Sequence, residues 1–321
     1  MNDSIRHRDN FFYKSYIMDA DNMAAFQNSC GNGCGCSFNS VPRRPPGYVA
    51  DDGLGALGNR QVLNLHNLRA ARPQPLQRQH ALLKRRHEPH CRIGKPGRFH
   101  RLLIGSPWLG AFDFPFGLPR EFVDALGLGA SAAAVSAELH RRCAGRMDFR
   151  ALVDAWSGAR PPGRRLVHRA TDTAMAGVQS TSPLQTRYVP VGFMYFEGLS
   201  RLLAAGVHLP ALHEGDPARV ALEAYPGWLA HELIGRRSYK NSDAADRLIA
   251  RKDLVDALEQ GRWRGLRIRL THAQREALVD DASGDRLDAV LCLLQAGWAA
   301  TQPAHAQPSA VDPVEGWITG V

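Results

Sequence analysis

Three aspartates have neighbours and a spacing that could support chemistry. Asp113 lies alone in the apolar, aromatic segment 108–117 (WLGAFDFPFG), and Asp285 and Asp288 open a second apolar segment near residue 285. A carboxylate among buried apolar residues is disfavoured unless a charge, a hydrogen bond or a metal compensates it. Two acids at i and i+3 lie on one face of a helix. If the fold brings the three carboxylates together, they form a site for a hard cation such as Mg²⁺.

Each of these acids also has a structural interpretation. Asp285 could be an ordinary N-cap and Asp288 the N3 acid of a capping box, which needs no metal. Asp113 could form an Asx turn before Pro115. Spacing alone leaves the helix pair open, whereas the aromatic surroundings of Asp113 favour a role in a site.

The elements that must position these acids indicate an α/β domain that spans residues 102–321. We predict a buried strand within 102–114, together with the turn that precedes it, and a second strand over 219–224. Apolar periodicity predicts helices over 119–126, 130–142, 148–156, 188–205, 228–234, 243–259 and 285–300. Thr271 and Gln274 have capping-box spacing before a further helix.

Residues 1–101 differ from this domain in composition. The chain has 321 residues and a net charge of +9, and residues 1–105 hold 16 of the 40 Lys and Arg but 7 of the 31 Asp and Glu. Residues 106–321 therefore hold 24 of each sign and are balanced. We predict a basic, poorly ordered N-terminal region, which is either a footprint for nucleic acid or a solvated arm.

Bulk properties limit the class of protein. A chain of this length with 44% hydrophobic residues can bury a sizeable core, in one large domain or two small ones. It shows neither a membrane-length apolar run nor an export signal, so we expect a cytoplasmic protein with no membrane partner and reduced cysteines. Cys30, Cys34 and Cys36, even with His90 and Cys91, do not match a recognised zinc pattern. The oligomeric state stays open.

From Asp113 onward, the order of several short segments resembles domain-of-unknown-function family number 429, which is described as predicted nucleases of RNase H-like fold. The matching segments are 110–119 (GAFDFPFGLP), 169–172 (RATD), 182–184 (SPL), 189–198 (VPVGFMYFEG), 222–227 (LEAYPG), 238–240 (SYK), 284–289 (GDRLDA) and 315–318 (EGWI). The resemblance implies an RNase H-like mixed sheet flanked by helices, with helical insertions.

The first third departs from that family. The resemblance implies an early strand with an aspartate in a setting like Gly-x-Asp-Phe-Ser, but the nearest analogue here places Ser37 where the acid would sit. The first strands are therefore degenerate by this comparison. Asp19 is a substitute acid, although its surroundings do not match.

The resemblance further implies a two-metal centre. In RNase H-like nucleases one metal activates water and the other stabilises the leaving oxygen. Asp113 would be the central-strand ligand of Mg²⁺ or Mn²⁺, and Asp285 with Asp288 the helix ligands.

Other residues are candidates for the same site. Glu223 could line the catalytic cleft or bond local backbone N–H groups. Arg169 and Asp172 lie in a polar loop and could contact substrate through a phosphate-gripping arginine, or simply hold the loop as an ion pair. Lys240, beside Tyr239, could face a nucleic-acid backbone or merely solvent.

We therefore predict a metal-dependent nuclease that hydrolyses phosphodiesters of nucleic acid. Two alternatives stay open. One is a catalytically inactive RNase H-like binding protein that has lost the first-strand acid. The other is a hydrolase of small nucleotide-like phosphates, since the balanced charge of residues 106–321 gives no broad basic face.

Overall fold

The computed structural model describes residues 103–104 and 107–321, together with the backbone of 15–19 and 62–64. Its central sheet has the strand order β1-β3-β5-β4. The strands are β1 (Ser15–Asp19), β3 (Trp108–Phe112), β5 (Asp216–Glu223) and β4 (Val207–His208). Strand β5 is parallel to both β3 and β4, whereas β1 is antiparallel to β3. A second sheet pairs β2 (Val62–Asn64) with β6 (Arg267–Arg269) in parallel.

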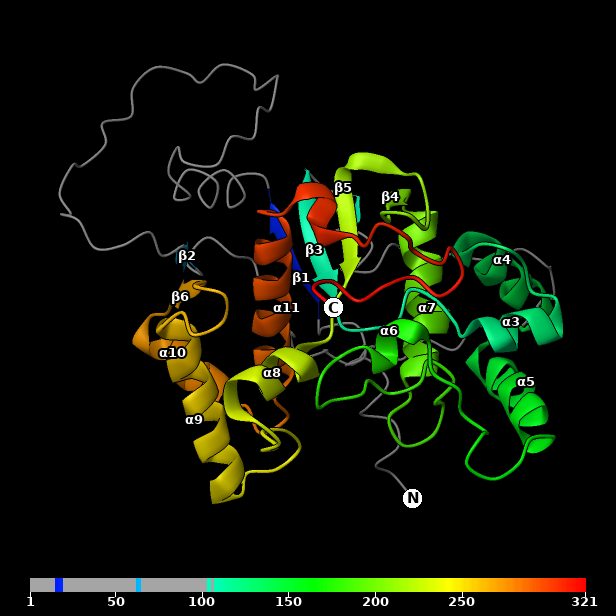
Figure 1. Cartoon of the computed structure of the whole chain (residues 1–321). Helices are drawn as coiled ribbons and strands as arrows, with labels where there is room; N and C mark the ends of the chain where they lie inside the picture. The colour runs from blue at the N-terminus through cyan, green and yellow to red at the C-terminus, as the bar shows by residue number, and fades with distance from the viewer. Residues whose placement is uncertain (1–14, 20–61, 65–102, 105–106) are drawn as a thin grey trace, which may run out of the picture.

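Helices cover both faces of the central sheet (Figure 1). On one side lie α3 (Arg120–Leu126), α4 (Ala132–Arg142), α5 (Arg146–Gly158) and α7 (Val191–Ala204). On the other lie α8 (Pro226–Ile234), α9 (Ala245–Glu259), α10 (His272–Val279) and α11 (Asp285–Ala299). The short α6 (Ala170–Thr173) completes the nine α-helices of the described residues. The chain is therefore a mixed α/β protein, as its sequence predicts.

Strand β3 owes its central position to five successive buried residues. An unbroken apolar run is typical of a strand covered on both faces. Successive side chains point to opposite faces. Accordingly, Trp108 and Phe112 join the core formed with α7, while Leu109 and Ala111 join the core formed with α11. In β5 the last four residues, from Val220 to Glu223, are also buried.

The predicted helices over 119–126, 130–142, 243–259 and 285–300 match α3, α4, α9 and α11 to within two residues at each end. Within the predicted segment 102–114, the observed strand β3 covers only Trp108–Phe112. Strands β4 and β6 were not predicted, because two or three residues are too few to show an alternating pattern. No helix among the described residues is both long and apolar enough to cross a membrane.

Strand β1 contains Asp19, the residue predicted as a substitute for the first-strand acid. Its register pairs Ser15 with Phe112 and Asp19 with Trp108. The backbone of Asp19 therefore lies at the opposite end of β3 from Asp113, and Asp19 does not replace the missing acid. Ser37 and the cysteine-rich segment 30–36 lie outside the described residues, as do His90 and Cys91.

Candidate functional site

The predicted acids lie at the ends of three elements. Strands β3 and β5 are parallel, and Phe112 faces Glu223 across them, so Asp113 and Glu223 come at the same edge of the sheet. Helix α11 packs against β3 and begins at Asp285, with Asp288 one turn later. The carboxyl ends of parallel strands are a common location for functional groups in α/β proteins.

Asp288 is fully buried, and its carboxylate accepts hydrogen bonds from two side chains of one loop. The Tyr239 hydroxyl donates to Asp288 Oδ1 at 2.6 Å, and Lys240 Nζ lies 2.5 Å from Asp288 Oδ2. Hydrogen bonds that involve an ionised partner are among the strong ones in proteins. The partial positive charge of the α11 N-terminus also favours the carboxylate.

Gly284 allows Lys240 to reach this position. It is the N-cap of α11, with a φ of 76°, and since a glycine has no side chain to cap the helix, Asp281 Oδ2 accepts the N–H of Arg286 at 2.9 Å instead. A Cβ atom on Gly284 would lie 2.9 Å from Cγ of Lys240. The capping-box interpretation of Asp285 and Asp288 is therefore wrong: Asp285 is the first helical residue, and Asp288 bonds a neighbouring loop.

The charges of Asp113 and Asp288 both act on two tyrosines, the partly buried Tyr225 and the buried Tyr239. Burial, followed by the charges of Asp113, Asp172 and Asp288, raises the pKa of Tyr225 to about 12. Burial and then Asp288 raise the pKa of Tyr239 well above its ordinary value, and Asp113 adds to that increase. Both phenols therefore stay protonated near neutral pH, and the charges of Asp113 and Asp288 act on both of them.

The predicted metal ligands do not form a metal centre as they lie. Within the described part of the chain, no group of three or more His, Cys, Asp or Glu side chains is arranged to hold a metal ion. Both oxygens of Asp288 already accept hydrogen bonds from Tyr239 and Lys240. Within the described residues, the structure thus does not place Asp113, Asp285 and Asp288 in one three-acid group.

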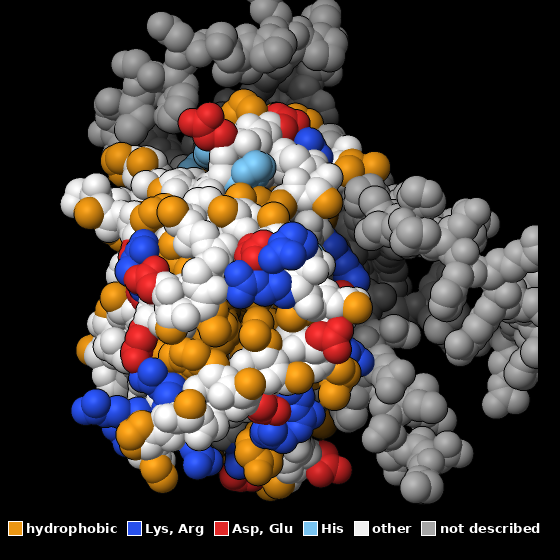
Figure 2. Space-filling view, turned by 90° about the vertical axis from the view of Figure 1, so that its right-hand side faces the viewer, with side chains coloured by type: hydrophobic (Ala, Val, Ile, Leu, Met, Phe, Trp, Pro, Cys, Tyr) orange, Lys and Arg blue, Asp and Glu red, His pale blue; other side chains and the backbone are white. Residues whose placement is uncertain are grey.

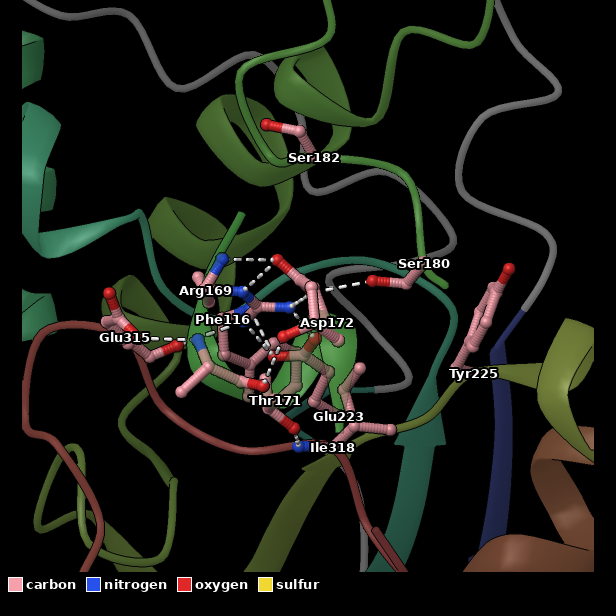
Figure 3. A network of polar contacts seen from close by, with 12 residues as sticks. Phe116, Arg169, Thr171, Asp172, Ser180, Ser182, Glu223, Tyr225, Glu315 and Ile318 are labelled. Atoms are coloured by element: carbon pink, nitrogen blue, oxygen red, sulfur yellow. Dashed lines mark hydrogen bonds and ion pairs between the residues drawn. The ribbon is translucent and has the colours of Figure 1, made fainter. Parts of the chain in front are cut away.

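Arg169, Asp172 and Glu223 form a separate buried network (Figure 3). Arg169 donates through Nη2 to Glu223 Oε1 at 2.5 Å and to Asp172 Oδ1 at 2.8 Å, and through Nη1 to the Glu315 carbonyl at 2.9 Å. The side chains of Arg169, Asp172 and Glu223 are at most 3% exposed. The ion-pair interpretation of Arg169 and Asp172 is thus present in the structure, and it extends to Glu223.

Glu223 also fixes the loop that follows Asp113. Its Oε2 accepts the backbone N–H of Phe116 at 2.8 Å, so its backbone partner is distant in sequence, not local. Burial raises the pKa of Glu223, and the Arg169 guanidinium opposes this only in part. Burial acts the same way on Asp172, but there Arg169 and the Ser180 hydroxyl prevail and hold the pKa below its usual value. In the structure these residues bond to one another and to the loop that follows Asp113.

Arg251 positions the other loop of the site and carries no signal in the sequence. It is 1% exposed and donates to three carbonyl oxygens, of Val279 at 2.6 Å, Ser242 at 2.9 Å and Tyr239 at 3.1 Å. The loop with Tyr239 and Lys240 is thereby tied to α9 and to the end of α10. Arg251 lies in α9, a helix rich in charged residues, so its sequence context does not distinguish it from the exposed arginines.

A pocket of about 460 Å³ opens beside Tyr239 and Lys240. It lies between residues 177–179, one side of α8 and residues 235–240.

Comparisons of the chain with protein-family models, with curated proteins and with solved structures found no match in any of the three.

Proposed function

We propose that the protein is an RNase H-like phosphodiesterase that acts on nucleic acid, with its centre at Asp113 and Asp288. One observation carries the proposal: Asp113 follows the carboxyl end of the central parallel strand β3, Asp288 lies near the start of α11, which packs on that strand, and both acids raise the pKa of Tyr225 and of Tyr239. An isolated pair of buried or half-buried carboxylates is unfavourable without compensating charge.

Mg²⁺ or Mn²⁺ belongs to this proposal because the resemblance to family number 429 implies it. A divalent cation would supply charge compensation and Lewis acidity to a reacting phosphate. In the structure, the Lys240 ammonium provides the positive charge at Asp288 instead. Cation binding at Asp288 therefore requires Lys240 to leave its carboxylate.

Calorimetric titration with Mn²⁺ tests this proposal without a guess about the substrate. We expect the parent protein to bind Mn²⁺, and Asp113→Asn and Asp288→Asn to abolish binding. Lys240→Met should strengthen it, because the competing ammonium is removed. Asp285→Asn shows whether Asp285 is a third ligand. If the parent and Lys240→Met both fail to bind, the metal-dependent reaction is excluded.

A second candidate is a non-catalytic protein of the same fold that binds nucleic acid. Two observations favour it: both oxygens of Asp288 are engaged by protein donors, and Asp19 lies at the wrong end of β3 to restore a first-strand acid. Incubation with labelled single-stranded and duplex DNA and RNA in the presence of Mn²⁺ separates the two candidates. Binding without cleavage supports this second candidate.

The surface favours a small or single-stranded substrate over a long duplex. Figure 2 shows the side of the molecule with α3, α4 and α5, away from α8 and α9, and there Lys and Arg side chains are interspersed with Asp and Glu. Residues 106–321 carry equal numbers of both signs. Binding along a duplex depends on many phosphate contacts from one basic surface. A hydrolase of nucleotide-like phosphates is therefore part of the same proposal.

A further inference from the structure

The charged side chains that line the pocket beside Lys240 are all basic. Arg236, Arg237, Lys240 and His231 line it, and none of its lining residues is Asp or Glu. Two of the cations are partly neutralised by acids outside the lining: Arg237 pairs with Asp253 at 2.5 Å, and Lys240 pairs with Asp288. Within the described residues, no partner is recorded for the exposed Arg236 guanidinium.

The rest of the lining is small or uncharged. Gly177 lies against the ring of His231, where an added Cβ would come within 3.0 Å of Cε1. Gly227 similarly lies against the ring of Tyr225, whose hydroxyl reaches the Gln179 carbonyl at 3.4 Å. These glycines therefore let the His231 and Tyr225 rings lie close to the backbone of the pocket wall. Val178 and Ala230 add an apolar surface.

We infer that this pocket binds the phosphate of a nucleotide-sized ligand, and the inference rests on the proposed function for the identity of that ligand. Guanidinium groups suit phosphate because they offer several donors in a planar fork. Arg236 would be the principal anchor, with the remaining donors of Arg237 and Lys240 beside it. Lys240 belongs to both the pocket and the Asp288 pair, so it would link a phosphate bound here to Asp288.

The size of the pocket limits the ligand. A volume of about 460 Å³ lies within the range of small-molecule sites. It accommodates one phosphate with a sugar or a base on the apolar wall, but not a long stretch of duplex. The ligand that follows is one nucleoside monophosphate unit.

Calorimetry on the full chain at low ionic strength tests this inference. The probes are thymidine 5′-monophosphate, inorganic phosphate and thymidine. We expect the monophosphate to bind and thymidine to bind at least ten-fold more weakly. Arg236→Ala should weaken binding of the monophosphate about ten-fold, as for the loss of a hydrogen bond between charged groups. Arg262→Ala removes an exposed arginine outside the pocket and should leave the affinity unchanged.

Equal losses in Arg236→Ala and Arg262→Ala, equal affinity for thymidine, or no binding of the monophosphate would overturn the pocket assignment. Asp113→Asn separates this result from the proposed function. If the parent protein binds the monophosphate but shows no hydrolytic activity, the pocket assignment is supported and the proposed hydrolytic function is overturned. Hydrolysis that is lost in Asp113→Asn, with an affinity that does not respond to Arg236→Ala, overturns the pocket alone.

Discussion

Lys240 and Asp288 form an ion pair with unequal exposure: the carboxylate is fully buried, whereas a quarter of the lysine side chain is exposed. The acid is therefore reached from solvent along the lysine. This arrangement makes Lys240 both the charge partner of the acid and the group that any ligand of Asp288 must displace.

Removal of the Lys240 ammonium should destabilise the fold. In Lys240→Met the buried Asp288 keeps the Tyr239 donor but loses its charge partner, so we expect a loss of about 2 kcal/mol in the free energy of unfolding. Urea denaturation measures it. Lys252→Met is the matched control, because Lys252 is exposed on α9. A loss of equal size in both variants would show that the pair with Asp288 contributes nothing specific.

The two tyrosines of the site should differ in their contribution to stability. Tyr239 donates to a buried carboxylate at 2.6 Å, whereas the Tyr225 hydroxyl reaches only a carbonyl at 3.4 Å. We expect Tyr239→Phe to cost about 2 kcal/mol and Tyr225→Phe less than about 0.5 kcal/mol. Thermal unfolding of the two variants compares them directly, and a reversed order would contradict this account.

Tyr225 should ionise late when the pH is raised. Its pKa is about 12 in the folded protein and about 10 as an ordinary phenol. The proton is held more tightly in the folded state, so the associated stability is fully present below pH 10 and is lost as the pH rises through about 12. An ultraviolet titration of tyrosinate, with Tyr225→Phe as the difference, measures this. Ionisation of Tyr225 near pH 10 would contradict the buried position.

The two acids of the Arg169 network should respond to pH in opposite directions. The pKa of Asp172 lies below its usual 3.8, so its contribution is present above that pH and is lost as the pH falls through the lowered pKa. The pKa of Glu223 lies above its usual 4.5, so its contribution is greatest below 4.5 and declines as the pH rises through the raised pKa.

Asp172→Asn should therefore destabilise most at neutral pH, and Glu223→Gln most at acid pH. Removal of one partner from a buried pair commonly costs about 3–5 kcal/mol, which sets the upper range for both. Urea denaturation at several pH values between 3 and 7 checks the two slopes. Parallel slopes would mean that Arg169 holds both acids in the same ionisation state.

Arg251 should be among the most sensitive positions in the chain. Arg251→Leu leaves the carbonyls of Val279, Tyr239 and Ser242 without this donor, and we expect a loss of about 3–5 kcal/mol. Arg251→Lys should recover only part of it, because an ammonium lacks the planar fork. Monophosphate affinity provides a second measurement, since the Tyr239 carbonyl holds the loop that lines the pocket. Unchanged stability in both variants would contradict the role of Arg251.

Local pattern was enough to predict much of the fold. The apolar run at β3 and the periodicity of α4, α9 and α11 are properties of neighbouring residues, and the capping box of Thr271 and Gln274 is present with both of its bonds. The same local reasoning identified Asp113 and Asp288, because a carboxylate in an apolar segment is visible in the sequence itself.

The partners of these acids could not be predicted in the same way. Asp288 bonds Tyr239 and Lys240, and Glu223 bonds Arg169, across separations of 48 to 54 residues that no periodicity links. Whether Arg169 contacts a ligand or stabilises a loop depends on burial, and burial is a property of the folded chain. The capping-box interpretation of Asp285 failed for a related reason: the positive φ of Gly284 moved the helix start by one residue.

The segment after Asp312 has a consequence for the order of folding. Glu315 accepts the backbone N–H groups of Arg120 and Ala170, and the Thr319 N–H donates to the carbonyl of Glu223. These bonds close the network around Arg169 from a part of the chain that is synthesised much later. Proteins fold progressively during synthesis, beginning with their N-terminal parts. The Arg169 network therefore cannot form all of its hydrogen bonds until the residues after Asp312 have been synthesised.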